Sequence, residues 1–186
     1  MTRRLEDVLS RQARLQPDAV GDSSLVTPPR ETPARSTGVP RFSLATIVAG
    51  KWLWVEDLAG MPLAREQVQL VQAMAGALQN IAGGATVATS GSKPDIAQFD
   101  WPMHSNEQLD LGTEAAGAAL SSFLRRRLEL GDLGLVFLGE AAAQRVPSGQ
   151  LSCDQVVLRH SSTELLVQPE LKKQTWSDLK SFLGRS

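Results

Sequence analysis

Two short apolar runs in the C-terminal third of the chain constrain the fold more than any other feature. The first, Leu133 to Leu138, ends at Gly139-Glu140, and the second, Gln155 to Leu158, ends at His160 to Thr163. Each run is short enough for a buried strand, rich in branched apolar residues, and followed directly by residues that start helices. This is the pattern of βα units, which form parallel sheets covered on both faces. Ligands are expected at the carboxyl ends of such strands.

The other expected elements complete an α/β domain over residues 41–186. Arg41–Val48 and Lys51–Glu56 are β-rich runs separated by Ala49-Gly50, which predicts a hairpin. We expect a helix from about Ala64 to Gln79, whose apolar residues recur at helical spacing. The remaining elements are a strand at Ala85–Thr89, a long loop at Ser90–Asp110, a helix from an N-cap at Thr113 to about Leu130, a helix at Glu140–Arg145, a turn through Val167 capped by Ser162 or Thr163, and a final helix over Glu170–Phe182 with Pro169 as its first residue. Together they predict three α/β/α layers with a mixed, mostly parallel central sheet.

Residues 1–40 are expected to form a disordered, flexible tail ahead of this domain. Five prolines lie among polar residues between Gln16 and Pro40, a composition that buries too little apolar surface to offset the entropy of ordering. Ahead of them, residues 3–15 would place their apolar side chains on one side of a helix. This segment is either a docking peptide on a flexible linker or an unstructured leader. The residues expected to make the docking contact are Arg3, Arg4, Leu5, Val8 and Leu9.

Composition narrows the class of protein. The 186 residues include 42% hydrophobic residues, enough for one domain with a sizeable core. The net charge of −1 gives no overall basic field, so contact with DNA is expected to be indirect. With Cys153 as the single cysteine and only His104 and His160 beside it, we expect no internal disulfide, no Cys/His zinc site and no cofactor. No stretch approaches the roughly 20 apolar residues that cross a bilayer, which predicts a cytoplasmic protein without a membrane segment.

The strand ends offer little catalytic chemistry. Neither has a glycine-rich phosphate loop, a pair of carboxylates, or a nucleophile beside a base, which favours a binding protein over an enzyme. His160 with Ser161, Ser162 and Thr163 fits an anion site, but a helix cap at Ser162 or Thr163 explains the same residues more simply. Glu140 fits a general base, or an acid that complements the dipole of the following helix. We therefore assign no catalytic, cofactor-binding or metal-binding residue.

Two further groups of residues have a functional and a structural interpretation. Asp100, Trp101 and His104 fall in the long expected loop, where they line a pocket or, with Pro102, belong to a rigid segment that covers the core. Residues 125–127 are three arginines at the end of an expected helix, where they contact phosphate or lie in solvent near the negative end of the helix dipole. The structural interpretation is the simpler one in both cases.

The four tryptophans are the candidate anchors of a protein interface, because tryptophan dominates binding hot spots when it lies outside the core. Trp52 and Trp54 alternate along an expected strand and therefore share one face. Trp101 belongs to the only aromatic cluster of the expected loop. Trp176 falls on the same side of the last helix as Leu179, so it belongs either to the core or to an interface.

Residues 159–180, together with residues 135–142, resemble the C-terminal half of the psi subunit of bacterial DNA polymerase III holoenzyme, an accessory protein of the clamp loader. That family shows a strand ending in a Leu-Gly-acid or amide turn, a second strand leading to a Ser/Pro-rich turn, a Leu-Leu pair, a proline and a Lys-x-x-Trp-x-x-Leu helix. The matching residues are Leu138-Gly139-Glu140, Ser161-Ser162, Leu165-Leu166, Pro169, Lys173, Trp176 and Leu179. The resemblance covers about a third of the chain.

The resemblance implies a fold similar to the uracil-DNA glycosylase superfamily, but without catalysis. A glycosylase stacks its flipped base in an aromatic pocket, whereas this chain has 5% aromatic residues, no tyrosine and no glycosylase-like water-activating segment. In psi proteins an N-terminal segment binds the clamp-loader motor subunit, and the globular domain binds the chi subunit, which holds single-strand DNA-binding protein. That N-terminal segment usually carries a tryptophan, whereas residues 3–15 carry none.

The leading prediction is a non-catalytic adaptor that links the replicative clamp loader to a chi-like partner and, indirectly, to single-stranded DNA. One alternative is a glycosylase-like nucleic-acid enzyme that uses His160 with Glu140 or Asp100. The other alternative is an interaction domain of an unrelated assembly. A deep pocket joining His160 to a carboxylate would favour the enzyme, and exposed apolar surface would favour the two binding proteins.

Overall fold

The computed structural model describes residues 38–81, 94–106, 108–131 and 133–183. These residues belong to one compact unit, Arg35–Ser186. The predicted tail lies outside the described residues, as do its docking residues and the strand predicted at Ala85–Thr89. Within the described ranges, none of the helices has the length and apolar character needed to span a membrane.

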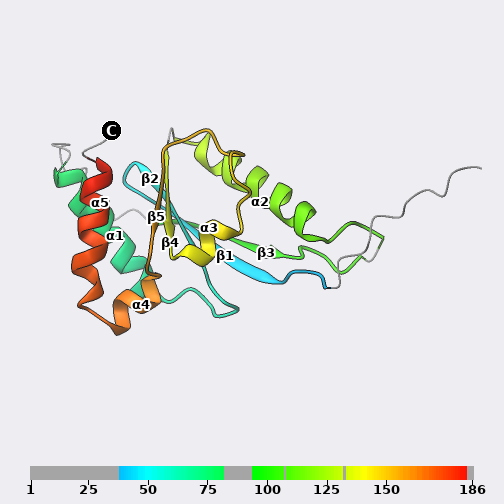
Figure 1. The fold of residues 1–186 in the computed structure, drawn as a ribbon, viewed down its shortest axis with the longest axis horizontal. Helices are drawn as coiled ribbons and strands as arrows, with labels where there is room; N and C mark the ends of the chain where they lie inside the picture. The colour runs from blue at the N-terminus through cyan, green and yellow to red at the C-terminus, as the bar shows by residue number, and fades with distance from the viewer. Residues whose placement is uncertain (1–37, 82–93, 107, 132, 184–186) are drawn as a thin grey trace, which may run out of the picture. The chain divides into compact units, whose positions relative to one another are not determined.

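A five-stranded sheet forms the centre of the domain (Figure 1). Its strands are Phe42–Ala49 (β1), Trp52–Asp57 (β2), Asp95–Trp101 (β3), Gly134–Leu138 (β4) and Gln155–Leu158 (β5). Their order across the sheet is β3-β1-β2-β4-β5. β1 is antiparallel to both β2 and β3, whereas β2 is parallel to β4 and β4 to β5. Four strands therefore share one direction and β1 runs against them, which confirms the predicted mixed, mostly parallel sheet.

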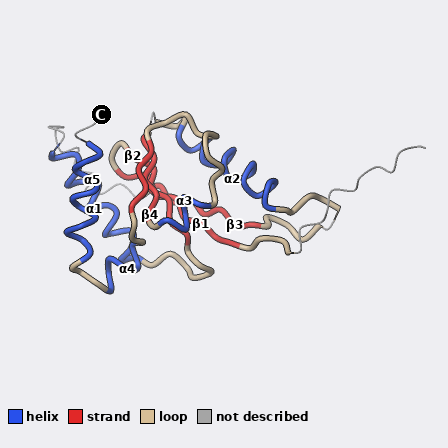
Figure 2. The backbone as a smooth tube through the Cα atoms, in the orientation of Figure 1, coloured by secondary structure: helices blue, strands red, loops and turns tan. Residues whose placement is uncertain are grey.

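Helices cover both faces of the sheet, which confirms the three predicted layers. They are Arg65–Ile81 (α1), Thr113–Leu128 (α2), Glu140–Gln144 (α3), Ser162–Val167 (α4) and Leu171–Leu183 (α5). Leu53 and Val55 of β2 pack with α2 and α3, whereas Trp54 packs with α1 and α5. This division follows from the alternation of side chains along a strand. Figure 2 shows the strands lying between α2 on one side and α1 and α5 on the other.

The loop predicted at Ser90–Asp110 is wrong over part of its length, because residues 95–101 form β3. Phe99 and Trp101 alternate with Asp100 along this strand, so both aromatic side chains enter the core while the carboxylate stays exposed. Trp101 lies opposite Phe42 in the β1–β3 register. Pairing with β1 and packing under α2 make this partly polar stretch a strand, and both contacts join residues far apart in the sequence.

Two helices start close to, but not at, their predicted positions. The N-cap of α2 is Gly112 rather than Thr113, because the Gly112 carbonyl already accepts a helical hydrogen bond from the N–H of Ala116, at 3.0 Å. Pro169 and Glu170 form a turn before α5 instead of its first residues. The other predicted elements among the described residues lie within two residues of their expected bounds.

Two glycines in helices provide a test of this packing. A Cβ atom at Gly76 in α1 would meet no atom within 4 Å, whereas a Cβ at Gly117 in α2 would lie 2.7 Å from Cγ of Pro147. We expect Gly76→Ala to raise the free energy of unfolding by about 1 kcal/mol, because alanine favours helix over glycine by that amount. Gly117→Ala should instead lower it, by about 1–3 kcal/mol, because the proline ring must move.

Urea denaturation of both variants beside the wild-type chain measures this difference. Since the two substitutions are chemically identical and both lie inside helices, each serves as the control for the other. An equal gain in stability from both substitutions would contradict the close packing of Pro147 on α2.

Candidate functional site

Three parallel strands end together at one edge of the sheet, where ligand sites of α/β proteins usually lie. The register places Glu56 at the end of β2 beside Leu138 of β4, and Leu138 beside Leu158 of β5. The turns that follow carry most of the polar residues singled out in the sequence, including Glu140 and His160. We call this region the strand-end edge.

Glu56 is a buried carboxylate at the strand-end edge. It is only 3% exposed, and it faces the layer of α1, α4 and α5 because it alternates with Asp57 on β2. Its two carboxylate oxygens accept hydrogen bonds from the backbone N–H of Ser162, at 2.8 Å, and from the Ser162 hydroxyl, at 2.5 Å. Ser162 itself is fully buried at the start of α4. The carboxylate therefore holds α4 against the end of β2.

Gln67 of α1 completes this cluster. Its side-chain amide donates to the Ser162 hydroxyl at 2.9 Å and to the Thr163 hydroxyl at 3.1 Å. Its amide oxygen accepts from the backbone N–H of Ala64 at 2.8 Å, just before α1 begins. Residues from β2, α1 and α4 thus satisfy one another, as buried polar groups must. We call Glu56, Gln67 and Ser162 the buried polar cluster.

Burial raises the pKa of Glu56 above the usual glutamate range, and the hydrogen bonds from Ser162 oppose this rise only in part. A raised carboxyl pKa beside a serine hydroxyl is also found at catalytic sites. Here, however, the serine hydroxyl is fully buried and donates to the carboxylate. In this arrangement the pair connects secondary-structure elements and presents neither a nucleophile nor a base to solvent.

The turn after β5 contains a complete capping box. Ser161 is the N-cap of α4, so the caps predicted at Ser162 and Thr163 are wrong. The Ser161 hydroxyl accepts from the N–H of Glu164 at 3.2 Å, and the Glu164 carboxylate accepts from the N–H of Ser161 at 2.8 Å. These bonds explain the shift of the cap, and the hydrogen bond from the Ser161 backbone is the main reason that the pKa of Glu164 is lowered.

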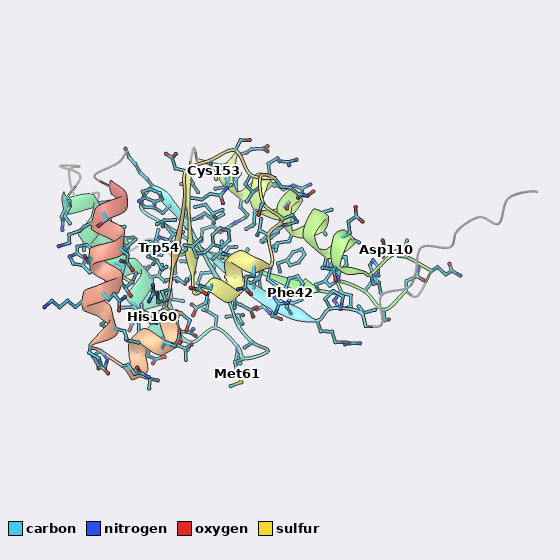
Figure 3. The ribbon with its side chains drawn as sticks, in the orientation of Figure 1. Phe42, Trp54, Met61, Asp110, Cys153 and His160 are labelled. Carbon is cyan, nitrogen blue, oxygen red and sulfur yellow. The ribbon has the colours of Figure 1, made fainter. Side chains whose placement is uncertain are left out.

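His160 lies just before this cap, beside α4 (Figure 3). Its ring is partly exposed, but its Nε2 atom is buried and makes no hydrogen bond with any described residue. No carboxylate of the described residues forms a hydrogen bond or an ion pair with this ring at the distances such contacts require. The charge of His160 contributes to the lowered pKa of the Glu164 carboxyl, but the two side chains form no hydrogen bond that would orient the ring as a general base.

The opposite face of the strand-end edge carries an ion pair. Asp57 at the end of β2 meets the Nε atom of Arg145 at 3.2 Å and accepts a hydrogen bond from the N–H of Ala59 at 2.9 Å. The Arg145 guanidinium also lies over the Phe42 ring, 4.8 Å from its centre. Arg145 is thus held by a charge and an aromatic face at the same time.

Two surface cavities adjoin at this ion pair, and Asp57, Ala59 and Arg145 line both of them. The smaller cavity, of 490 Å³, also includes Glu140 and Arg159, but not His160. We call it the strand-end cleft. The acidic and basic side chains that line this cleft nearly balance in charge. Among the described residues, no group of three His, Cys, Asp or Glu side chains is arranged to hold a metal ion.

Asp100, Trp101 and His104 all line the larger cavity, of 680 Å³, as the pocket interpretation predicts. Trp101 is nevertheless a core residue, 6% exposed, whose Nε1 atom donates to the carbonyl of Leu111 at 3.3 Å. Asp100 accepts hydrogen bonds from Ser43 and Gln98, and the bond from Ser43 is the main reason that its pKa is lowered. An anionic Asp100 in this position does not favour the binding of phosphate.

The four tryptophans divide between core and surface. Trp54 is 1% exposed, and its Nε1 atom donates to the Ala49 carbonyl at 3.2 Å, so it belongs to the core with Trp101. Trp52 shares the face of Trp54, as predicted, and is half-buried. Trp176 is also half-buried, against the same cluster. Only Trp52 and Trp176 therefore keep side-chain area that a partner protein can reach.

The arginines at the end of α2 contact their own domain. Arg127 forms an ion pair with Asp95 of β3 at 3.0 Å, and Arg125 donates to the carbonyl of Gln150 at 3.3 Å. Arg126 is exposed. Two of the three guanidinium groups thus bridge α2 to neighbouring segments.

Glu56 and Gln67 are the site residues that sequence reasoning missed. The signal for Glu56 was present, because an acid two positions after the last aromatic residue of an apolar strand shares the face of that residue. Gln67 gave no comparable signal, since it occurs among other glutamines on a helix.

Comparisons of the chain with protein families, curated proteins and solved structures found no match. The resemblance to psi subunits therefore rests on the sequence motifs alone.

The raised pKa of Glu56 predicts how the stability of the chain depends on pH. Because the native pKa of Glu56 lies above its unfolded value, the native chain binds more protons than the unfolded chain between those two values, and stability falls as pH rises through that window. Glu56→Gln removes the titration. We therefore expect the wild-type chain to lose stability relative to Glu56→Gln as pH rises above the ordinary glutamate pKa of 4.5.

Urea denaturation at several pH values measures the difference between the two chains. Glu66→Gln, at an exposed position of α1, controls for the loss of one negative charge. A difference that stays constant with pH, or that moves in favour of the wild-type chain as pH rises, would show that burial does not dominate the environment of Glu56.

Proposed function

We propose that the chain is a non-catalytic adaptor of the DNA replication clamp loader. In this proposal the tail binds the loader's motor subunit, and the globular domain binds a chi-like partner that connects it indirectly to single-stranded DNA. The observation that carries the proposal concerns residues 159–180, the segment that resembles psi subunits. This segment forms α4 and α5, which create with α1 a surface groove lined mainly by apolar side chains. Apolar surface of this kind is typical of protein interfaces.

The strand-end edge supports a binding role as well. Its buried carboxylate and serine hydroxyl are hydrogen-bonded to each other and connect β2 with α4. Of the two arginines that line the cleft, Arg145 is already paired with Asp57. A glycosylase-like enzyme would instead need a pocket in which His160 and a carboxylate meet, and the strand-end cleft does not include His160.

Reconstitution tests the proposal. The full-length chain is mixed with the clamp-loader motor subunit and the chi-like subunit of its own organism, and the complexes are separated by size-exclusion chromatography. We expect a ternary complex with the full chain. A chain without residues 1–40 should lose the motor subunit and keep the chi-like subunit.

A finer variant replaces Leu5, Val8 and Leu9 with serine, and a scrambled order of residues 16–40 is its matched control. The serine variant should lose the motor subunit and the scrambled linker should retain it. Binding of neither subunit by the full chain would overturn the proposal. Release of uracil from uracil-containing DNA, lost in His160→Ala, would favour the enzyme instead.

A further inference from the structure

Helix α1 has an outward side that is unusual for a surface helix. From Gln67 to Ile81 it contains no charged residue. Leu70, Met74, Ala77 and Ile81 recur at helical spacing along one side, none of the four is fully buried, and Ile81 is 51% exposed. Surface helices normally carry charges at such positions, and a continuous apolar stripe marks a binding surface.

Two residues of this stripe, Leu70 and Met74, line one wall of a groove. Figure 1 shows α1 and α5 side by side on the same side of the sheet. The groove between them has a volume of 190 Å³. Besides Leu70 and Met74, its lining includes Leu165 of α4 and Trp176 and Leu179 of α5. We call it the α1–α5 groove.

A buried hydroxyl lies in this apolar lining. Thr175 is 3% exposed, and its Oγ1 atom makes no hydrogen bond with any described residue. The oxygen atom itself is buried, so the surface that the groove presents to a partner is mainly apolar.

The other wall of the groove, on α5, includes Lys172, and two more lysines lie near it. On a helix surface, residues three and four positions apart are neighbours. The neighbours of Trp176 on α5 include Lys172, Lys173 and Lys180, and all three lysines are exposed. Asp178 projects from another side of α5, because two positions along a helix correspond to a rotation of about 200°. A half-buried tryptophan with lysines around it thus lies across the groove from the uncharged part of α1, residues 67–81.

We propose that the α1–α5 groove binds an amphipathic helix of a partner protein, with acidic side chains along the flank that faces α5. Its apolar side chains would pack on Leu70, Met74 and Trp176, and its acids would approach the three lysines. This inference rests on the proposed function, because the partner is the protein that the globular domain holds.

Charge reversal tests the inference in the full-length chain with the chi-like subunit. Lys172→Glu combined with Lys180→Glu should weaken binding at least about tenfold, because the partner's acids then face acids. Arg41→Glu combined with Arg126→Glu reverses two exposed charges outside the groove, and it should change the affinity less than about twofold. Thermal unfolding of each variant establishes that it is folded.

A second pair of variants tests the apolar wall. Met74→Glu places a charge inside the groove and should weaken binding by at least about tenfold. Gln72→Glu adds the same charge to the same helix outside the groove lining, and it is the matched control. If the wild-type chain binds the chi-like subunit and all groove variants bind equally well, the inference fails while the proposed function stands.

A peptide probe tests the groove without the natural partner. The probe is a synthetic helix of about 18 residues, long enough to be partly helical alone, with leucines along one side and glutamates beside them. Its counterpart has lysines in place of the glutamates. Fluorescence anisotropy should show at least about tenfold tighter binding of the acidic peptide to the wild-type chain, and Lys172→Glu with Lys180→Glu should remove this preference.

Three further outcomes would overturn the inference. Lysines beside a tryptophan also suit single-stranded nucleic acid, which stacks bases on aromatic rings. If an oligothymidylate binds and the acidic peptide does not, with binding lost in the same lysine variants, the groove is a nucleic-acid site. If the wild-type chain is a dimer by sedimentation and Met74→Glu makes it a monomer, the occupant is a second copy. If the wild-type chain shows no preference between the two peptides, the groove does not select an acidic helix.

Discussion

Hydrogen bonds between a buried carboxylate and a helix start fix the positions of two helices on the sheet. A carboxylate inside a protein is strongly unfavourable unless hydrogen bonds replace the water it has lost. Ser162 supplies two of these bonds to Glu56, and Gln67 in turn donates to the Ser162 hydroxyl. Because the three residues come from β2, α4 and α1, any movement of one element breaks a bond to another. Leu165 follows Ser162 by one turn, so the same cluster locates the floor of the α1–α5 groove.

The central strand β2 explains why the domain has two separate helical layers. Its side chains enter one hydrophobic cluster at Leu53 and the other at Trp54. Trp52 needs space across the neighbouring strand, where its register partner is Gly134. A Cβ atom at that glycine would lie 2.2 Å from the Trp52 ring. The absence of a side chain on β4 therefore allows a half-buried tryptophan to lie flat against the sheet.

Much of this fold could be predicted from the sequence because its signals are local. The βα units at β4 and β5, the β1–β2 hairpin and the long helices all follow from periodicity and from turn residues. β3 was missed because its strand conformation depends on pairing with β1, and Asp95, Gln98 and Asp100 make the segment look like a loop. The partners of Glu56 were equally hidden, since Ser162 lies 106 positions away. The sequence also did not indicate which tryptophans are buried. Trp54 and Trp101 lie in the core, whereas Trp176 is partly exposed.

The ion pairs within the domain affect which surface can bind a charged ligand. At the strand-end cleft, a ligand that binds Arg145 must compete with Asp57, and the Arg145 guanidinium also rests on an aromatic ring, so Arg159 is the more accessible cation there. In the α1–α5 groove, by contrast, the lysines around Trp176 form no ion pair with any described residue. Binding there leaves the existing contacts of the domain intact, so the groove can accept a charged partner at a lower cost than Arg145 can. At the position that α/β folds commonly use for ligands, Glu56 and Asp57 make contacts that hold the layers together, whereas the proposed binding surface lies on the outer side of a helical layer.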